Sequence, residues 1–209
     1  MKILHLTVGM VATNCYIFYD ENTMDGAVID AGENAKAILK VVADEKINLK
    51  YVLLTHGHFD HILAVNEVVK TTGAKLVCHK DDLWLLDKEA MGQFKQFATN
   101  FVKTPVDIEA EDGTELKIGS LTAKYISTPG HTPGSSVIVV DDVMFTGDTL
   151  FKGECGRCDL EGGDYPTILR SLKKLYDMQG DYKVLPGHDA FTTLQAEREH
   201  NRYMREAVK

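Results

Sequence analysis

Short apolar runs, some alternating with polar residues and some continuous, recur along this chain. Four of them lie near the N-terminus, and their spacing and β-branched content predict strands. These runs are residues 2–8 (KILHLTV), 14–19 (NCYIFY), 26–32 (GAVIDAG) and 51–56 (YVLLTH). Between the last two, Ile38, Val41 and Val42 share one face of residues 34–46, with charges opposite, which predicts an amphipathic helix.

The middle of the chain again shows patterns typical of helices and of strands. Residues 62–69 have apolar positions at helical spacing, residues 75–79 (KLVCH) predict a strand, and residues 81–101 predict a helix. On this last helix Phe94, Phe97 and Phe101 are three and four positions apart and form one aromatic face. Such a face usually packs into a core, and the alternatives are a flap over a functional site or a dimer contact.

The second half repeats this pattern. Strands are predicted at residues 114–119, 121–128, 135–141, 143–148 and 183–188, and helices at 164–178 and 192–209. No linker rich in Pro, Gly or Ser divides the chain, so we expect a single domain spanning residues 1–209. Strand-rich halves with helices predict two sheets packed face to face with helices outside, and a doubly wound parallel sheet fits less well.

Composition narrows the function classes. The chain has 209 residues, 44% hydrophobic and 26% charged, with a formal net charge of −8. This balance argues against a nucleic-acid binder, although bound cations could still attract an anionic substrate. The N-terminus lacks a secretory signal, no apolar run could cross a bilayer, and four cysteines make no disulfide scaffold. We therefore expect a soluble, cytoplasmic protein that binds a small molecule and neither nucleic acid nor membrane.

One stretch concentrates metal-binding side chains. Residues 55–61 (THGHFDH) end an apolar strand and hold three of the eight histidines of the chain. In extended chain His56 and His58 point the same way and can bind one ion, whereas Asp60 and His61 follow after the chain has turned. Gly57 permits the close backbone approach that such a turn needs. This cluster predicts a metal site.

Further ligands must come from other strand ends. His131, Asp148 and His188 each lie in a glycine-containing turn beside an apolar strand. Alone, each of these residues would more often be structural, and Asp148 would suit an Asx turn. Given the cluster at 55–61, they become the expected partners, because loops at strand ends commonly carry catalytic groups.

These motifs together resemble a known family. THGHFDH, PGHTPGS, TGDTLF and PGH, in this order and spacing, are similar to the metallo-β-lactamase superfamily. The most similar branch is the glyoxalase II-like (hydroxyacylglutathione hydrolase-like) one, in its short form without the C-terminal glutathione-binding domain. The resemblance implies an α+β fold, a four-layer αββα sandwich of two mixed sheets with the metals at one edge. It also implies two metal sites, one held by His56, His58 and His131 and the other by Asp60, His61 and His188, with Asp148 bridging both and Asp60 also a candidate catalytic residue.

The implied activity is hydrolysis of a thioester or related small ester. The expected cofactors are two divalent metal ions, Zn²⁺ first, with Fe or Mn also compatible with nitrogen and oxygen ligands. The bridging aspartate and the missing signal peptide make antibiotic hydrolysis a weaker prediction. Two departures bear on glutathione: Arg157 stands where the family has a lysine, and Asp159 where a substrate-binding tyrosine is expected.

Other functions stay open at this point. A persulfide dioxygenase would bind one iron through His56, His131 and Asp148. A nuclease of the same superfamily is disfavoured by the acidic balance, and a non-catalytic metal-binding protein by the size of the ligand set. Cys155 and Cys158 form a C-x-x-C pair that could be redox-active, but a glycine-rich loop is not the usual setting for one.

Overall fold

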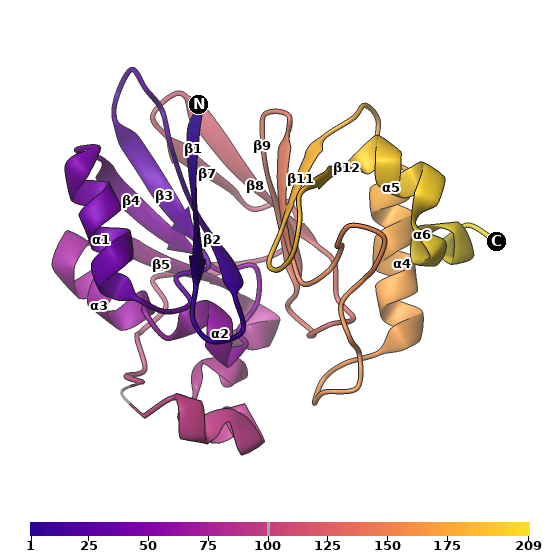
Figure 1. Cartoon of the computed structure of the whole chain (residues 1–209), viewed down its shortest axis with the longest axis horizontal. Coiled ribbons are helices and arrows are strands. Elements are labelled where there is room, and N and C mark those ends of the chain that lie inside the picture. The colour runs from indigo at the N-terminus through magenta and orange to yellow at the C-terminus, as the bar shows by residue number, and fades with distance from the viewer. Residues whose placement is uncertain (100) are drawn as a thin grey trace.

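Two six-stranded sheets lie face to face, and helices cover the outer face of each (Figure 1). The structure is a computed structural model that describes residues 1–99 and 101–209, with only the backbone of Gln93. Within these residues no helix is long and apolar enough to cross a membrane. The predicted four-layer αββα sandwich of two mixed sheets is confirmed, whereas the single-domain assignment of 1–209 stays a prediction.

The first sheet holds the N-terminal half of the chain in sequential order. Its strands are β1 (Lys2–Val8), β2 (Thr13–Tyr19), β3 (Asp25–Ile29), β4 (Asn48–Leu53), β5 (Lys75–His79) and β6 (Ile108–Ala110). The first three are antiparallel, and β3 to β6 are parallel. Parallel neighbours need crossover connections, which here contain α1 (Ala35–Asp44) and the pair α2 (Phe59–Ile62) and α3 (Val65–Thr72).

The second sheet is built from the C-terminal half. Its order is β12-β11-β10-β9-β8-β7, and only β10 and β11 are parallel neighbours. These strands are β7 (Glu115–Ile118), β8 (Leu121–Ser127), β9 (Ser136–Val140), β10 (Val143–Gly147), β11 (Lys183–Pro186) and β12 (Thr192–Thr193). The helices α4 (Tyr165–Tyr176), α5 (Leu194–His200) and α6 (Arg202–Ala207) cover its outer face (Figure 1).

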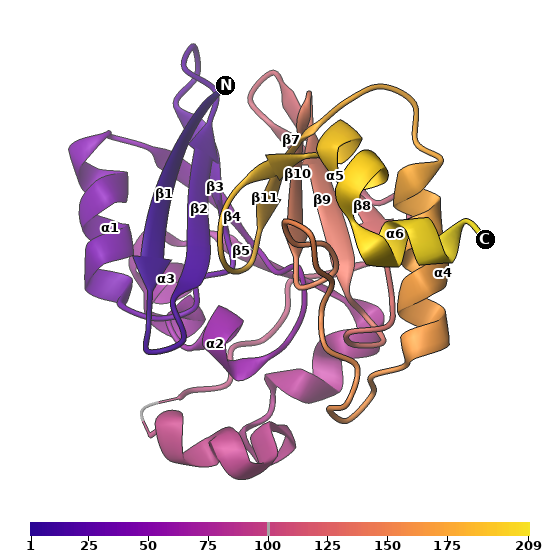
Figure 2. The same cartoon turned by 45° about the vertical axis from the view of Figure 1, so that its right-hand side comes forward.

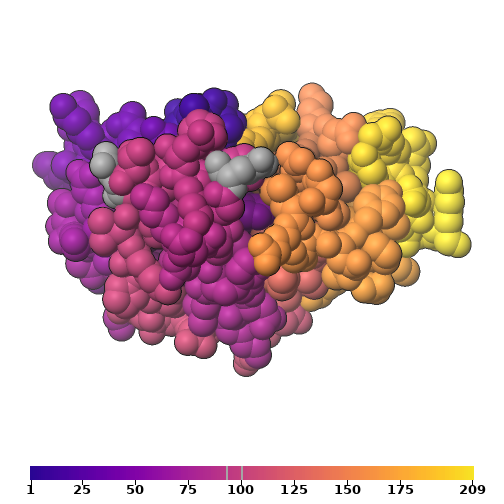
Figure 3. Space-filling model, turned by 90° about the horizontal axis from the view of Figure 1, so that it is seen from below, coloured from indigo at the N-terminus to yellow at the C-terminus, as the bar shows by residue number. Residues whose placement is uncertain are grey.

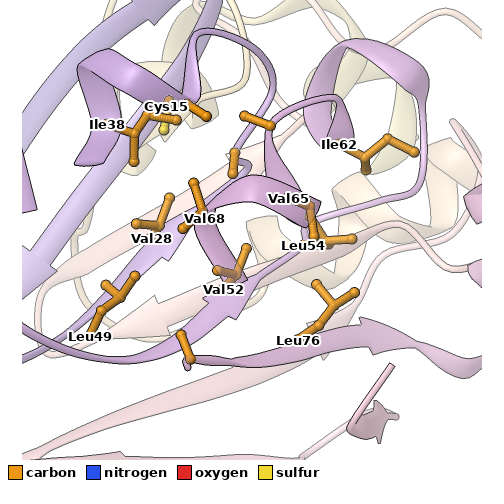
Figure 4. Close-up of a cluster of buried hydrophobic side chains, with 14 of the residues drawn as sticks. Cys15, Val28, Ile38, Leu49, Val52, Leu54, Ile62, Val65, Val68 and Leu76 are labelled. Atoms are coloured by element: carbon orange, nitrogen blue, oxygen red, sulfur yellow. The ribbon is translucent and has the colours of Figure 1, made fainter. Parts of the chain in front are cut away.

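Three apolar layers hold these elements together. Between the sheets, Phe18 stacks on Phe145 with ring centroids 5.5 Å apart. Beneath α1 and α3, Ile38 and Val68 pack on the outer face of the first sheet (Figure 4). A third cluster, which includes Leu172, lies between the second sheet and the C-terminal helices. Two sheets each buried on both faces provide a rigid frame for the loops at their edges.

The aromatic segment 81–101 differs from the prediction. Instead of one α-helix it forms two 3₁₀ helices, η1 (Lys80–Leu86) and η2 (Lys88–Phe97). Asp87 is extended and its carboxylate accepts a hydrogen bond from the Glu89 amide, which starts a new helix. Gly92 has φ 51° and ψ −125°, which interrupts the helix again. The prediction of helical structure in this segment was therefore right, but the predicted single α-helix was wrong, because local capping and the Gly92 backbone divide the segment.

Other boundaries also moved. The helix expected at 62–69 is divided into α2 and α3, and the helix expected at 192–209 is divided at Asn201. The Asn201 side chain accepts hydrogen bonds from the amides of Tyr203 and Met204, so it caps α6. The strands β6 and β12 were not predicted, because segments of three and two residues are too short to show a period.

One edge of the sandwich collects the loops predicted to carry chemistry. The loops that follow β4, β8, β10 and β11 contain His56–His61, His131, Asp148 and His188 respectively. In Figure 2 this edge is the lower one, where α2 lies beneath the strands and above the η1–η2 segment.

Candidate metal centre

Three histidines from two loops form the first group of donors. Candidate ligand atoms of His56, His58 and His131 all lie within 4.8 Å of one another. His58 Nδ1 and His131 Nε2 are 2.9 Å apart, although these residues are 73 positions apart in sequence. The strand ends of the two sheets therefore bring together the trio that the resemblance implies for a first ion.

A second group lies beside the first. Asp60, His61 and His188 also offer donor atoms within 4.8 Å of one another. The Oδ2 atom of Asp60 is 3.3 Å from His61 Nε2 and 3.2 Å from His188 Nε2. These residues come from α2 and from the loop after β11, so this trio also depends on both sheets.

Asp148 lies between the two groups. Its Oδ1 atom is 3.5 Å from His61 Nε2, and its Oδ2 atom is 3.6 Å from both His131 Nε2 and His188 Nε2. A single carboxylate thus approaches histidines of both trios, which is the position that a bridging ligand requires.

The chemistry of these donors fits metal ions. Within the described residues, His56 Nε2, His61 Nε2 and Asp148 Oδ1 are buried without a hydrogen-bond partner. Leaving a buried polar atom unpaired costs about 1–3 kcal/mol, so three such atoms in one place indicate a missing partner. A divalent cation supplies that partner for imidazole nitrogen and carboxylate oxygen alike, and Zn, Fe and Mn all accept this donor set.

Protonation at the first group also suits a cation. Burial, together with the neighbouring histidines, lowers the pKa of His58 to about 3 and that of His56 well below its ordinary value. Both imidazoles are therefore neutral near pH 7, as a metal ligand must be.

At the second group, neighbouring carboxylates favour a protonated histidine. Burial lowers the pKa of His61, but Asp60, Asp30 and Asp148 outweigh it and hold the pKa well above its usual value. Burial likewise opposes ionisation of Asp60, yet His61 and His188 keep its pKa below the usual range. A cation bound here would replace the proton of His61, so binding should release protons.

Asp30 supports His61 and was missed in the sequence. Its buried carboxylate accepts hydrogen bonds from the Thr55 amide (2.8 Å) and hydroxyl (2.6 Å), and its Oδ2 atom is 2.9 Å from His61 Nδ1. Asp30 also lies near His56, but both its oxygens are already engaged, so it orients His61 rather than serving as a ligand. A polar residue ending the apolar run GAVID was the available signal.

Backbone and hydroxyl groups orient two other imidazoles. His131 Nδ1 is 2.7 Å from the carbonyl oxygen of Arg157, and His56 Nδ1 is 3.1 Å from the Thr55 hydroxyl. A hydrogen bond at Nδ1 leaves Nε2 free to face an ion. The backbone carbonyl of Arg157 thus orients His131.

Asp82 joins the two loops that carry the first trio. It is fully buried on η1 and accepts hydrogen bonds from the Gly57 amide (3.0 Å), the Gly134 amide (2.6 Å) and the Thr132 hydroxyl (2.7 Å). Burial raises the pKa of its carboxyl group. No sequence motif pointed to Asp82, because its partners lie 25 to 52 positions away.

The turn before His188 has room only for glycine. A Cβ atom added at Gly187 would lie 2.3 Å from Asp148 Oδ1 and 2.9 Å from His61 Cε1. The backbone of the second sheet therefore approaches the candidate ligands directly.

The C-x-x-C pair and the other histidines lie outside this centre. Both cysteines are free thiols, and burial raises the pKa of both, that of Cys155 to about 12. This disfavours the thiolate that redox chemistry needs. His79 bonds Ser127, and His5 bonds Asn14, so these two histidines have structural partners.

A hollow opens above the two groups. Its volume is about 190 Å³, and its walls include His58, Asp60, His131, Asp148 and His188. The remaining lining residues are Val11, Phe59, Phe94, Arg157 and Leu160. Figure 3, seen from below, shows the molecular surface between the η1–η2 segment and the loop after β10, where this hollow lies. Of the aromatic face of residues 81–101, Phe94 lines this hollow, while Phe94 and Phe101 also pack against the core, so the face has both of the roles that the sequence left open.

The fold and this cluster of histidines and aspartates together define a class of protein. A family model described as the metallo-beta-lactamase superfamily matches residues 8–188. The chain belongs to this superfamily.

Relatives and solved structures agree over nearly the whole chain. Hydroxyacylglutathione hydrolase GloC of Haemophilus influenzae is 30% identical, and the probable metallo-hydrolase YqgX of Bacillus subtilis is 32% identical, each covering 98% of both chains. The crystal structure of BLEG-1 B3 metallo-beta-lactamase has a TM-score of 0.90 at 31% identity, covering 97% of this chain and 99% of that one. The di-iron-bound form of TTHA1623 has a TM-score of 0.84 at 29% identity, covering 96% and 99%.

Proposed function

We propose that this protein is a binuclear metal-dependent hydrolase that cleaves a thioester or a related small ester. The observation that carries the proposal is the position of Asp148, whose carboxylate lies within 3.6 Å of histidines from both trios. Two complete groups of three donors joined by one carboxylate suit two cations better than one. The similarity to a protein named hydroxyacylglutathione hydrolase supports thioesters as the substrate class.

The bound cations would lower the pKa of water toward neutrality and polarise a substrate carbonyl. Five of the seven candidate ligands line the hollow, and Phe59, Phe94 and Leu160 form apolar walls beside them. Asp60 accepts a hydrogen bond from the Thr13 hydroxyl at 3.0 Å. Because Asp60 Oδ2 lies 3.3 Å from His61 Nε2 and 3.2 Å from His188 Nε2, its carboxylate suits ligation and orientation of water better than general-base catalysis. We propose the first two roles for it.

Metal content and thiol release test this proposal together. Protein purified and reconstituted with Zn²⁺, Fe²⁺ or Mn²⁺ should contain two ions per chain by elemental analysis. The same samples should release thiol from at least one member of a panel of acyl thioesters that includes S-lactoylglutathione. A metal-replete protein that releases no thiol from any of them would refute the proposal. A His188→Ala variant, which leaves His56, His58 and His131 intact, should bind one ion tightly and lose most of the activity.

β-Lactam hydrolysis is the second candidate, because the similarity to BLEG-1 exceeds 30% identity and covers nearly both chains. A cephalosporin that changes colour on ring opening belongs in the same panel. If the protein opens this ring with a higher kcat/KM than it cleaves any thioester, β-lactam hydrolysis replaces thioester hydrolysis as the proposed function.

The mononuclear persulfide dioxygenase is the third arm of the test. Such an enzyme needs only one ion, and the three donors of Asp60, His61 and His188 would then have no role. One iron per chain, with oxygen uptake in the presence of glutathione persulfide, would favour it over hydrolysis.

A further inference from the structure

Three neighbouring hollows surround the candidate metal centre, and they share their walls. The first lies above the centre, with a volume of about 190 Å³. The second and third have volumes of about 150 Å³ each and extend to either side. Phe59 lines all three, while Phe94 and Leu160 line the first and second. We call these three hollows together the apolar cleft.

Aromatic and aliphatic side chains form most of this cleft. Phe59 stacks on Phe94 with ring centroids 4.9 Å apart and an interplanar angle of 10°, and Phe97 lies 6.1 Å from Phe59. Val11, in the turn between β1 and β2, lines two of the hollows and is 45% exposed. Phe97 lines the third hollow and is 40% exposed. Exposed apolar side chains gathered around a cavity mark a site for an apolar ligand.

The charges around the cleft do not favour an anionic ligand. Arg157 is the one cationic residue among the described lining residues other than histidines, and its guanidinium donates two hydrogen bonds to Asp159, at 2.6 and 2.7 Å. Glu161 lines the second hollow and Glu33 the third. Arg157 is thus already paired with a carboxylate, and the remaining charges of the rim are negative.

Glutathione carries two carboxylates, so a rim that binds it needs free cationic groups. Arg157 lines the first hollow, and Asp159 lies two positions further along the same loop. In the structure these two residues pair with each other. The guanidinium of Arg157 thus already contacts a carboxylate of the chain itself, which partly neutralises its charge, and both side chains are exposed to solvent.

We propose that the apolar cleft binds an uncharged apolar arm of the substrate, and that the enzyme prefers neutral thioesters or esters with such an arm to glutathione conjugates. This inference rests on the proposed function and names the substrate class. A cavity of about 150 Å³ holds one benzene ring, so an arm of about six carbons or one phenyl group fits each side hollow.

Kinetics with a graded series tests the preference. The acetyl, butanoyl, hexanoyl and phenylacetyl thioesters of N-acetylcysteamine vary the acyl arm, and benzyl thioacetate places the apolar arm on the thiol. Each buried methylene should raise kcat/KM about threefold to fourfold, so hexanoyl, with four more methylenes than acetyl, should exceed it by about tenfold when two are buried and by about 80-fold to 250-fold when all four are. The hexanoyl thioester should also exceed S-lactoylglutathione. Comparison of phenylacetyl with benzyl substrates shows which side of the bond the cleft accepts.

Substitutions in the apolar cleft test whether it causes the preference for longer acyl arms. Leu160→Ser and Phe94→Ser should each lower the hexanoyl-to-acetyl ratio of kcat/KM by about fivefold to tenfold, because the arm loses apolar contact. Val102→Ser is the matched control, since Val102 is 50% exposed and lines none of the three hollows. Asp159→Asn frees the guanidinium of Arg157, so it should raise the ratio of S-lactoylglutathione to hexanoyl turnover.

Binding gives a readout that does not require turnover. The non-hydrolysable S-hexyl thioether of N-acetylcysteamine should bind at least about tenfold more tightly than the S-methyl thioether by calorimetry, with and without metal. Leu160→Ser should remove this difference.

The outcomes separate the two proposals. Thioester hydrolysis that is independent of arm length, or is fastest with S-lactoylglutathione, overturns the apolar-arm inference and leaves the proposed function intact. Tight S-hexyl binding without hydrolysis of any thioester overturns the proposed function and supports the cleft as a site for apolar ligands.

Discussion

Asp30 illustrates how a residue outside the donor groups can control them. Its carboxylate is held by the Thr55 amide and hydroxyl, and it approaches His61 at Nδ1. This contact fixes the ring so that Nε2 faces Asp60 and Asp148. Supporting residues of this kind set the geometry and the basicity of the imidazole that they contact.

An Asp30→Asn substitution should therefore weaken metal binding. The amide keeps the size of the side chain but lacks the negative charge that stabilises His61, so we expect a loss of about 10–100-fold in affinity. Competition with a chelating indicator measures this loss. Asp25→Asn, at the start of β3 and five positions before Asp30, is the control and should leave the affinity unchanged. Equal affinities for all three proteins would show that Asp30 has no role at the metal centre.

At the scale of elements, the short helix η1 links parts of the site that belong to different sheets. Asp82 on η1 receives hydrogen bonds from the loop after β4 and from the loop between β8 and β9. The aromatic segment that follows on η2 covers the same edge. The η1–η2 segment is therefore both a wall of the cleft and a brace for its floor.

Asp82→Ala should destabilise the protein markedly. The buried amides of Gly57 and Gly134 would lose their acceptor, so the free energy of unfolding should fall by about 2–4 kcal/mol. Urea denaturation measures the change. Asp81→Ala is the control, because the Asp81 side chain is 54% exposed and should contribute less than about 0.5 kcal/mol. If both variants unfold at the same urea concentration, the hydrogen bonds that Asp82 accepts do not stabilise the fold.

At the scale of the molecule, the two sheets are tied together at both ends of β2. Near the candidate metal centre, Asn14 Nδ2 donates hydrogen bonds to the carbonyl oxygens of Pro186 and Asp189, each at 3.0 Å, and its amide donates to the Gly187 carbonyl at 2.7 Å. At the far end, Asp20 accepts hydrogen bonds from the amide and hydroxyl of Ser120. The first tie holds the turn that carries His188.

Asn14→Ala should loosen that turn. Loss of the hydrogen bonds to the carbonyls of Pro186 and Asp189, and of the one with His5, should lower the free energy of unfolding by about 1–3 kcal/mol and speed amide exchange across residues 187–190. Hydrogen exchange followed by mass spectrometry tests this.

Tyr16→Phe provides the comparison for Asn14→Ala. It removes one hydrogen bond, from the Tyr16 hydroxyl to the Pro186 carbonyl at 2.6 Å, and leaves the contact to Asp189 in place. Exchange at residues 187–190 that is as slow in Asn14→Ala as in the unchanged protein would contradict the proposed tie.

The tie at Asp20 predicts a pH dependence. Hydrogen bonds from Ser120 and Asn22 hold the pKa of Asp20 well below its usual value. Because the folded pKa is lower than that of the unfolded chain, ionised Asp20 stabilises the fold fully above about pH 4–5, and this contribution is lost as the pH falls toward the folded pKa. The difference in urea midpoint between the unchanged protein and Asp20→Asn should thus be largest near neutral pH and shrink toward pH 3. A constant difference would exclude this linkage.

The elements and most of the candidate site could be predicted from local patterns. Most strands of both sheets appear as short apolar or alternating runs, and helices α1 and α4 appear as a period of 3.6 residues because one face of each helix is buried. The seven candidate ligands can be recognised in the sequence because histidine and aspartate are metal-binding residue types and lie in turns at the ends of predicted strands. The sequence alone therefore determined the layers of the fold and the composition of the candidate metal centre.

Only the tertiary structure decided how this centre is supported and what covers it. Asp30 and Asp82 meet partners 25 to 52 positions away, and no local period records such contacts. The division of residues 81–101 at Asp87 and Gly92 depends on single caps and backbone angles, and the pairing of Arg157 with Asp159 depends on how their loop folds. Burial of one face of an element produces a periodic pattern of apolar residues that can be read from the sequence. A hydrogen bond between distant segments leaves no such pattern, because it forms only when the chain has packed.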